Sequence, residues 1–424
     1  MSEELAAPSA PIADAPERTS IWLWIKQQMK NDAAKTAFGA WLALRCYCAF
    51  IGVALYSILP TNVYTTDLQI AFGGHLPACP QYVAPLAGLP GALVGMWLRW
   101  DTPWYLEIAA HGYSCYGSSA FMPLYPLLIR GMGIMIGGNN LTAALLISTI
   151  ASFFAFYLLY LLARELTGST EIARASVIVL ALFPVSFFLM AGYTEAIFLA
   201  LAIGAYLAAR RGSWLVAGGL TALATLTRLQ GILLLVPLGL ELLLTRRSEV
   251  RSWRPWLALL LGPMALAFFI AYIRLTEGLG LPWEPLSSAR GPWHLSYAWP
   301  WQGIIADLSA LISQPDLGTF LSSKLFDPLS AVLFALCTVL AFRRLNIPLA
   351  VFLAVMWLSS VIKVNSDGST TSTSRYMLAL FPAFIVLGML VVRWPRLARL
   401  GVGIGSGILL SVYLFIFLIW GWVA

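Results

Sequence analysis

Long apolar runs separated by short polar connections fill the chain from residue 38 onward. About eleven of these runs have, or nearly have, the roughly 20 residues with which a helix crosses a bilayer. Several contain only about 15 residues, so we expect them to tilt little or to be flanked by polar residues that still lie within the membrane. The runs are Phe38–Leu59, Leu141–Leu162, Ala175–Ala191, Tyr193–Ala209, Ser213–Thr227, Leu229–Leu244, Trp256–Ile273, Leu325–Phe342, Ile347–Ile362, Tyr376–Val392 and Val402–Ala424. The pattern predicts an all-α polytopic membrane protein.

The distribution of basic residues between the runs predicts the topology. A cytoplasmic N-terminus places most of the 26 Lys and Arg residues, including the Arg246–Arg254 cluster, on the cytoplasmic side, as the positive-inside rule requires. The apolar stretch Phe121–Gly137 would invert every later loop if it crossed the membrane. Because it contains two prolines and Arg130, we expect an interfacial or re-entrant helix there. Two long non-cytoplasmic loops result, at about residues 60–140 and 276–324.

Composition agrees with a membrane protein and excludes other classes. The 424 residues are 60% hydrophobic and 11% charged, and the mean hydropathy is +0.81, far above the value of a soluble domain. The net charge of +7 comes from short clusters rather than from one continuous face, which excludes a nucleic-acid partner. Residues 1–37 are polar and rich in Pro and Ala, so we expect a disordered cytoplasmic tail before a single membrane domain over residues 38–424.

Five cysteines are too few for a disulfide framework, and none is spaced as a metal site requires. We expect Cys46, Cys48 and Cys337 to pack within membrane helices. Cys79 and Cys115 share the first non-cytoplasmic loop, where an oxidising compartment would permit a disulfide. Because the sequence does not supply the geometry, a bond between them and two free thiols both stay open.

A few charged residues fall at or beyond the external membrane face, where each is costly unless it is paired or hydrated. They are Arg99, Asp101, Glu107, Arg130, Glu195, Arg228, Lys363, Asp367 and Arg375. Asp101 lies among aromatic rings in the segment Arg99–Tyr105, which suits a general base beside a sugar face. An ion pair of Asp101 with an arginine that merely anchors the loop explains the same residues equally well.

Glu195 and two arginines have alternatives of the same kind. Glu195 falls where one run ends and the next begins, and capping of a helix N-terminus is the favoured interpretation. Arg228 and Arg375 lie in external turns, where a guanidinium suits a phosphate through bidentate hydrogen bonds. Extension of the side chain to lipid headgroups costs less and is the favoured interpretation for either arginine singly. Two arginines that converge on one external pocket would favour the phosphate site.

Tryptophans crowd the second external loop, at Trp283, Trp293, Trp299 and Trp301. An interfacial belt explains most of them, and a sugar-stacking surface is the alternative. The chain contains no Gly-rich phosphate loop and no Asp-x-Asp, serine-nucleophile or zinc motif. Because the cytoplasmic loops are also too short to build a nucleotide site, we expect an activated donor to be lipid-borne and reached from the external side.

A series of short motifs extends from the first external loop to the tenth apolar run. They are Arg99-Trp100-Asp101 with Trp104-Tyr105, His111-Gly112-Tyr113, Phe121–Leu127, Phe183-Pro184 with Tyr193-Thr194-Glu195, Leu226-Thr227-Arg228 with Gly231, Trp299-Pro300-Trp301 and Ser374-Arg375-Tyr376. In order and spacing they resemble the PIG-V-type mannosyltransferases of GPI-anchor synthesis and their bacterial relatives, which share the GT-C membrane glycosyltransferase fold. Ser288-Ala289-Arg290 departs from the glutamine that relatives often show before the second-loop tryptophan, which leaves the acceptor contacts open.

The resemblance implies a polyprenyl-phosphate sugar donor with mannose as the expected sugar, no cofactor or obligatory metal, and Asp101 as catalytic base. We expect an inverting transfer in which Arg228 or Arg375 holds the charge of the leaving lipid phosphate. The candidate substrate-binding residues are Arg99, Trp100, Trp104, Tyr105, Glu107, Tyr125, Arg130, Tyr193, Glu195, Gln230, Trp293, Trp301 and Tyr376. Because the chain is shorter than a eukaryotic member should be, we expect a bacterial plasma-membrane protein, or one of the endoplasmic reticulum if the source is eukaryotic.

Two other classes of function compete with an enzyme. A transporter or flippase of a lipid-linked intermediate would also have many spans, but it predicts internal repeats and charges near mid-membrane. The charged candidates cluster at one face instead, which favours transfer of the sugar to a lipid-linked or glycan acceptor outside the cytoplasm. A structural scaffold leaves the Arg99–Tyr105 segment unexplained. The acceptor and the oligomeric state do not follow from the sequence.

Overall fold

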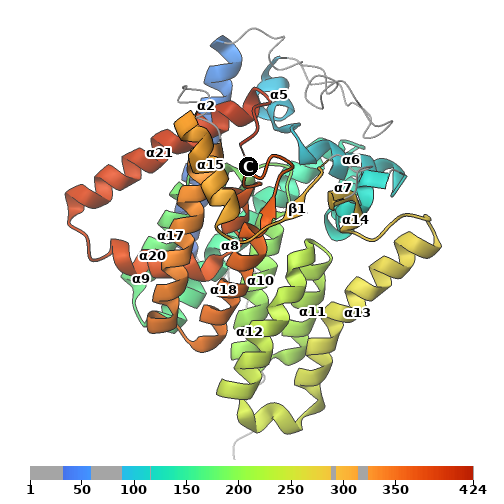
Figure 1. Cartoon of the computed structure of the whole chain (residues 1–424), viewed down its shortest axis with the longest axis vertical. Coiled ribbons are helices and arrows are strands. Elements are labelled where there is room, and N and C mark those ends of the chain that lie inside the picture. The colour runs from blue at the N-terminus through green and yellow to red at the C-terminus, as the bar shows by residue number, and fades with distance from the viewer. Residues whose placement is uncertain (1–31, 59–87, 115, 288–292, 314–322, 424) are drawn as a thin grey trace, which may run out of the picture.

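The computed structural model describes residues 32–58, 88–114, 116–287, 293–313 and 323–423, and nearly all of the secondary structure there is helical (Figure 1). Five helices of this part of the chain are long and apolar enough to cross a membrane. They are α2 (Asp32–Ile58), α8 (Asn140–Thr167), α13 (Trp253–Leu275), α17 (Ser323–Arg344) and α21 (Arg396–Leu418). The expected all-α, multi-pass membrane fold is therefore confirmed.

Shorter helices complete the fold in two groups. Those between the long helices are α9 (Thr170–Leu182), α10 (Glu195–Arg210), α11 (Trp214–Thr225), α12 (Leu235–Leu240), α18 (Ile347–Val361) and α20 (Phe381–Val391). Those in or beside the expected external loops are α5 (Gly88–Leu93), α6 (Asp101–His111), α7 (Leu124–Met135), α14 (Glu284–Ser287), α15 (Gln302–Ser313) and α19 (Thr373–Met377). In Figure 1, α5, α6, α7, α14 and α15 gather at the upper end, whereas the connection from α12 to α13 lies at the lower end.

Most of the expected apolar runs coincide with helices. In the N-terminal half, however, one helix begins earlier than expected and another ends earlier. Helix α2 already begins at Asp32, inside the expected tail, and Asp32 forms an ion pair of 2.9 Å with Arg174 of α9. The run Ala175–Ala191 is not one helix, because α9 ends at Leu182. Phe183 precedes a proline and has the extended ψ of 132° that such a position favours.

Three later runs also depart from a continuous α-helix. The run Leu229–Leu244 forms a 3₁₀ helix before α12 and a π-helical turn after it. The run Tyr376–Val392 is interrupted between α19 and α20, where Pro382 opens the second helix. The run Val402–Ala424 is helical only to Leu418. These spans are short because their ends leave the helical conformation, and the pocket described below lies among those ends.

The stretch Phe121–Gly137 contains α7, whose 12 residues are too few to span a bilayer. Where an interfacial or re-entrant helix was expected, the chain thus forms a short helix packed on α6 and α8. Leu127, Ile134 and Met135 are exposed on it, as suits a helix with one face toward lipid. A backbone hydrogen bond of 2.8 Å from the Leu124 amide to the Leu226 carbonyl ties this stretch to the end of α11.

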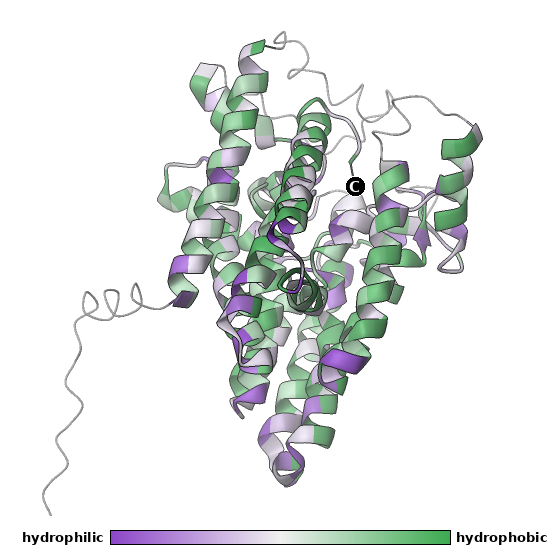
Figure 2. Ribbon diagram, turned by 90° about the vertical axis from the view of Figure 1, so that its left-hand side faces the viewer, coloured by the Kyte–Doolittle hydropathy of each residue, from purple (hydrophilic) through white to green (hydrophobic). Residues whose placement is uncertain are grey.

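Close helix packing holds the central part of the fold together. Helices α8 and α9 are joined by Gly168, which adopts a left-handed φ of 68°, and Ser169, whose side chain caps α9 at the Ile172 amide. A Cβ on Gly218 of α11 would lie 2.5 Å from the Cα of Ala258 in α13, so these two helices approach more closely than a side chain permits. Hydrophobic residues run along the helices, and hydrophilic ones collect at the lower tips in Figure 2.

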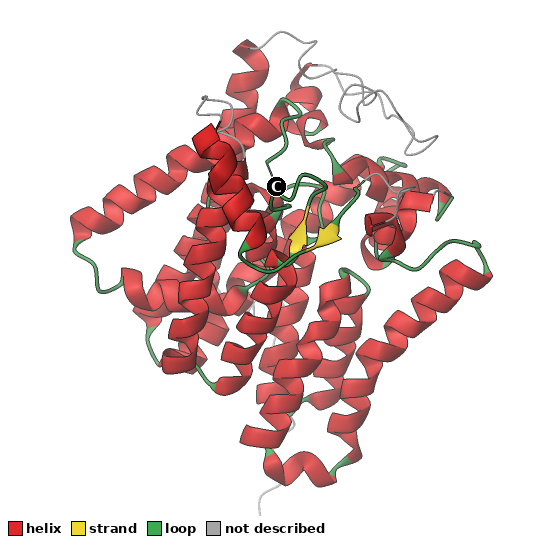
Figure 3. Cartoon of the chain, in the orientation of Figure 1, coloured by secondary structure: helices red, strands yellow, loops and turns green. Residues whose placement is uncertain are grey.

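A ribbon of two short strands joins the loop before α15 to the segment after α18 (Figure 3). Strand β1 (Ser296–Tyr297) from the second external loop pairs antiparallel with β2 (Lys363–Val364), which follows α18. The register sets Tyr297 opposite Lys363, and an isolated bridge joins Val364 to Thr370. The ribbon therefore places Lys363 beside the loop that leads to α19.

Several expectations concern residues that the structure does not describe. The tail up to residue 31, both cysteines of the proposed disulfide, Cys79 and Cys115, and the segment Ser288-Ala289-Arg290 lie outside the described residues. Of the other cysteines, Cys48 and Cys337 are buried in helices as expected, whereas Cys46 is exposed on α2. These three are free thiols.

Candidate active site

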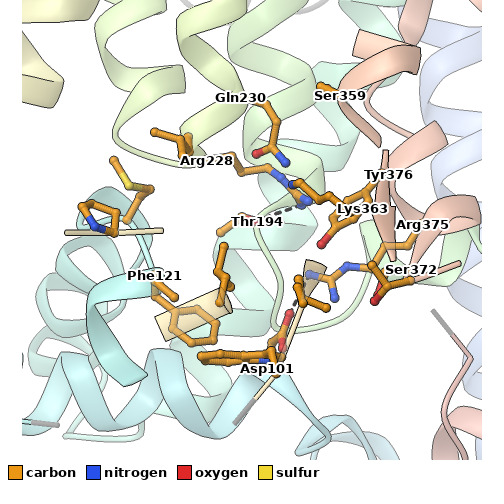
Figure 4. A pocket seen from close by; sticks show the side chains of 18 of the residues that line it. Asp101, Phe121, Thr194, Arg228, Gln230, Ser359, Lys363, Ser372, Arg375 and Tyr376 are labelled. Atoms are coloured by element: carbon orange, nitrogen blue, oxygen red, sulfur yellow. Dashed lines mark hydrogen bonds and ion pairs between the residues drawn. The ribbon is translucent and has the colours of Figure 1, made fainter. Parts of the chain in front are cut away.

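A pocket of about 390 Å³ lies where α6, α19, the β-ribbon and the connection from α11 to α12 meet (Figure 4). Seven of the residues selected from the sequence line it, namely Asp101, Tyr105, Arg228, Gln230, Trp293, Arg375 and Tyr376. These residues come from four separate parts of the chain. The pocket is therefore an assembly of helix ends and of loops that the sequence analysis expects to be external.

Asp101 is the first residue of α6, and it lines the pocket. Its backbone amide donates to the hydroxyl of Tyr193 at 3.2 Å, and that hydroxyl donates to the carbonyl of Arg99 at 3.3 Å. The residue between them, Trp100, has a φ of 51°, an uncommon conformation for a bulky side chain. Tyr193 thus holds a strained turn that directs the carboxylate of Asp101 into the pocket.

Two arginines and two carboxylates form one charged cluster. Nη2 of Arg375 lies 2.6 Å from Oδ2 of Asp101, and its Nε lies 2.5 Å from Oε1 of Glu195. Nη1 of Arg228 lies 2.5 Å from the same Oε1. Figure 4 shows the guanidinium of Arg375 extending toward Asp101. The two arginines that the sequence identified singly therefore converge on one pocket.

Exposure separates the two carboxylates of this cluster. The side chain of Glu195 is 2% exposed, whereas that of Asp101 is 15% exposed and lines the pocket. Only Asp101 of the two is accessible to a bound molecule. Glu195 is the first residue of α10, as the capping interpretation expected, but its described contacts are to guanidinium groups rather than to the helix.

The segment that presents Arg375 is held by two buried aspartates. Asp327 of α17 accepts hydrogen bonds from the amides of Thr373 at 3.1 Å and Ser374 at 2.8 Å, which are the first N–H groups of α19. Asp307 of α15 accepts from the amide and hydroxyl of Thr370, and burial raises its pKa to about 6. Sequence analysis did not select either aspartate, because each lies in an apolar helix far from Arg375 in sequence.

The turn that presents Arg228 depends on close backbone packing. Gly231 lies against the end of α11, where an added Cβ would be 2.3 Å from the amide nitrogen of Thr225. The Gly231 amide donates to the Arg228 carbonyl at 2.8 Å, and Nη1 of Arg228 reaches the hydroxyl of Thr194 at 3.3 Å. The chain therefore turns sharply enough to bring this arginine back toward Glu195.

Aromatic side chains form the wall beside Asp101. Phe121 and Trp293 line the pocket, and Trp104, outside the lining, stacks on Phe121 with ring centroids 5.6 Å apart and contacts Trp293. Tyr105 packs edge-on against Phe121, and burial raises the pKa of its hydroxyl, so it stays protonated. Of the tryptophans in the second loop, Trp293 belongs to this wall. Trp299 and Trp301 are exposed and stacked on each other away from the pocket.

Two further residues of the pocket carry chemistry that the sequence did not assign. Lys363, one of the charged residues expected at the external face, lines the pocket from β2. Trp422 follows α21 and lines the pocket as well, with its ring 4.9 Å from that of Trp100. The sequence did not indicate this role, because Trp422 falls within the apolar run Val402–Ala424, for which a continuous helix is expected.

The other selected residues lie outside the pocket lining. Arg99 is buried, donates to the Leu418 carbonyl and lies over the ring of Trp420. Glu107 is buried and lies beside His111. The hydroxyl of Tyr125 forms hydrogen bonds with Ala144 and Ser148 of α8. Arg130 is exposed on α7. Among the residues that the structure describes, no three His, Cys, Asp or Glu side chains are grouped to hold a metal ion.

Residues 45–245 match the family model described as Mannosyltransferase (PIG-V). The matched segment contains Asp101, Glu195 and Arg228, and it ends before Lys363 and Arg375. The resemblance that the motifs predicted is therefore confirmed over this segment, in which the chain has the features of the PIG-V mannosyltransferase family.

Individual proteins show the same relationship. The Mus musculus protein named GPI alpha-1,6-mannosyltransferase 2 is 30% identical over 258 residues, which is 53% of this chain and 52% of that protein. The Homo sapiens protein of the same name is 30% identical over 189 residues, covering 40% and 38% of the two chains. GPI mannosyltransferase 2 of Schizosaccharomyces pombe is 29% identical over 140 residues, covering 32% and 30%. The chain thus spans about half the length, or less, of these curated relatives.

Two solved structures show a more distant likeness. ArnT from Cupriavidus metallidurans in the apo state matches 71% of this chain and 56% of its own, with 17% identity and a TM-score of 0.45. The archaeal oligosaccharyltransferase AglB from Archaeoglobus fulgidus, in complex with an inhibitory peptide and a dolichol-phosphate, matches 90% and 55%, with 13% identity and a TM-score of 0.40.

Proposed function

We propose that this protein is a mannosyltransferase of GT-C type that transfers mannose, with inversion, from a polyprenyl-phosphate donor to a lipid-linked or glycan acceptor. The observation that carries the proposal is the position of Asp101. Its carboxylate is the accessible member of the buried charge cluster, and it faces a pocket that also contains three cationic side chains. The family match and the relatives named GPI mannosyltransferases support mannose as the sugar.

The proposed reaction needs one proton transfer and one displacement. The acceptor hydroxyl gives its proton to Asp101 while its oxygen forms a bond to the anomeric carbon. The bond from that carbon to the phosphate oxygen breaks, and the electron pair leaves with the polyprenyl monophosphate. Positive side chains of the pocket stabilise the charge that develops on this leaving group. The sugar is then joined to the acceptor with inverted configuration.

The aromatic rings of Tyr105, Phe121 and Trp293 line the pocket together with Asp101 and give it an apolar surface, and Trp104 packs against Phe121 and Trp293 outside the lining. Such a surface suits the weakly polar face of a sugar ring or the first isoprene units of a lipid carrier. A flippase would need its charges along the middle of the spans. Here Asp101, Glu195 and Arg228 all lie at helix ends, which favours the enzyme.

The direct test uses the full chain reconstituted in liposomes with polyprenyl-phosphate mannose labelled in the sugar and a total membrane lipid extract. We expect label to move to a lipid or glycan product, which mass spectrometry then identifies, and polyprenyl monophosphate to accumulate in equal amount. Transfer of label only from a soluble nucleotide sugar would overturn the proposed donor. Movement of the intact donor between leaflets without any product would favour the flippase.

A further inference from the structure

Lys363 has an environment that differs from those of the two pocket arginines. It lies on β2 opposite Tyr297, and its Nζ lies 5.0 Å from the centroid of the Tyr376 ring. Within the described part of the chain, no carboxylate forms an ion pair with it, and its side chain is half-buried at the pocket wall. Figure 4 shows Lys363 among Tyr376, Arg228 and Arg375.

The arginines are already engaged by protein carboxylates. Arg228 is paired with Glu195, and Arg375 is paired with both Glu195 and Asp101 at distances of 2.5 to 2.6 Å. Both guanidinium groups are nearly buried, with 9% and 7% of their side chains exposed. Removing either from its carboxylate to bind a ligand would leave a buried charge without its partner, which is costly.

The charged side chains of the pocket carry one positive charge more than they carry negative charges. The two carboxylates offset the two arginines, and Lys363 adds a positive charge that nothing in the described residues offsets. A phosphodiester carries a single negative charge, which matches this excess. The lysine ammonium is also a compact group on a flexible side chain. Its three N–H donors can keep their hydrogen bonds to the phosphate while negative charge develops on the leaving oxygen.

We propose that Lys363 is the residue that binds the phosphate of the lipid-linked donor, and that Arg228 and Arg375 form the framework that positions Asp101 and Tyr376. This inference rests on the proposed function. It changes the assignment made from the sequence, in which the arginines bind the phosphate. The ring of Tyr376, which lies 5.4 Å from the Arg228 guanidinium, separates the framework from the lysine.

The test measures binding of a short-chain polyprenyl monophosphate and of the uncharged polyprenol of the same length to detergent-purified full chain. We expect Lys363→Gln to weaken binding of the monophosphate roughly tenfold or more, as loss of a charge-assisted contact does, and to leave polyprenol binding unchanged. Lys363→Arg keeps the charge and should retain much of the affinity. Lys324→Gln is the matched control, since Lys324 is the other described lysine near this end and pairs with Asp367.

Two outcomes are distinguishable. If wild type prefers the monophosphate over polyprenol and Lys363→Gln retains that preference, the role of Lys363 is refuted while the proposed donor stands. If wild type shows no preference for the monophosphate, the proposed function itself fails. In transfer assays the Lys363→Gln variant should raise KM for the donor without changing KM for the acceptor, a split that a loss of folding would not produce.

Discussion

One carboxylate oxygen, Oε1 of Glu195, organises the charged side chains of the pocket. It accepts hydrogen bonds from both Arg228 and Arg375, and it is buried away from the pocket surface. Attraction between opposite charges is strong where water is excluded, so this contact fixes both guanidinium groups. Asp101 touches only one of them and remains accessible. Glu195 therefore serves as a structural counter-charge, and Asp101 is free to react.

At the residue scale the sharpest prediction concerns Asp101→Asn. The amide keeps the size of the side chain but cannot take a proton, so kcat should fall by roughly 100- to 10,000-fold. Arg375 keeps its contact with Glu195, so the thermal unfolding temperature should change little. Initial rates with labelled donor measure the effect. Glu277→Gln, at a carboxylate outside the pocket, should keep normal rates, and normal turnover by Asp101→Asn would rule out the base assignment.

Glu195→Gln should behave differently from Asp101→Asn. Loss of this buried charge leaves two guanidinium groups with a single carboxylate between them, and breaking a buried ion pair costs roughly 3 to 5 kcal/mol. We expect a clear fall in unfolding temperature in detergent together with loss of activity. An unfolding temperature equal to that of wild type would contradict the role of Glu195 as counter-charge.

The residue types of the site could be predicted from the sequence, but their pairing could not. The sequence indicates Asp101, Arg228 and Arg375, because a charged side chain at membrane depth is costly unless it has a partner or a function. The anchoring alternative for Asp101 expected an arginine partner, and that partner is Arg375 rather than the neighbouring Arg99. Contacts between residues so far apart depend on how helix ends pack, which hydropathy does not encode.

Among the helices, α11 and α18 end where the chain reaches the pocket, and α9 ends at Leu182, before the last residues of its apolar run. Apolar runs predicted where each helix would be, because burial in lipid and in the core demands continuous hydrophobic residues. They did not predict where the helix stops, because the unwound segments are themselves apolar, as in Ser186–Leu189. Pro184 and Pro382 were the available signals, and each lies beside one of the interruptions.

The turn after α11 offers a prediction with a close control. Gly231→Ala would drive a Cβ into the backbone of Ala224 and Thr225, so it should destabilise the protein by about 1 to 3 kcal/mol or more and displace Arg228. Gly219→Ala in α11 meets nothing within 4 Å and should be neutral or stabilising by roughly 0.5 to 1 kcal/mol. Thermal unfolding and transfer rates of both variants provide the comparison. Equal effects of the two would refute the packing explanation.

At the scale of the whole molecule, charge and position agree with the proposed topology. The pocket lies with the helices of the loops expected to be external at one end, and the basic connection between α12 and α13 lies at the other in Figure 1. The positive-inside rule assigns the second end to the cytoplasm. We therefore propose that the pocket opens to the non-cytoplasmic side.

Cysteine accessibility tests this topology. In a background with the native cysteines replaced by serine, Tyr297→Cys at the pocket wall should react with a membrane-impermeant maleimide added outside intact cells. Arg251→Cys, in the basic connection, should react only after the membrane is permeabilised. Tyr297 is 66% exposed, so a failure to react from outside would place the pocket on the cytoplasmic side and remove the basis of the proposed donor access.

The contact of Trp422 with Trp100 has a consequence for biosynthesis. One wall of the pocket comes from the first external loop and another from the residues that follow α21. Translation delivers the wall from the first loop before the wall that follows α21, so a nascent chain already carries Asp101 in the membrane long before the pocket can close around a substrate. Competence to bind should therefore arise in one step, when α21 has been inserted and its following tryptophans reach the turn at Trp100.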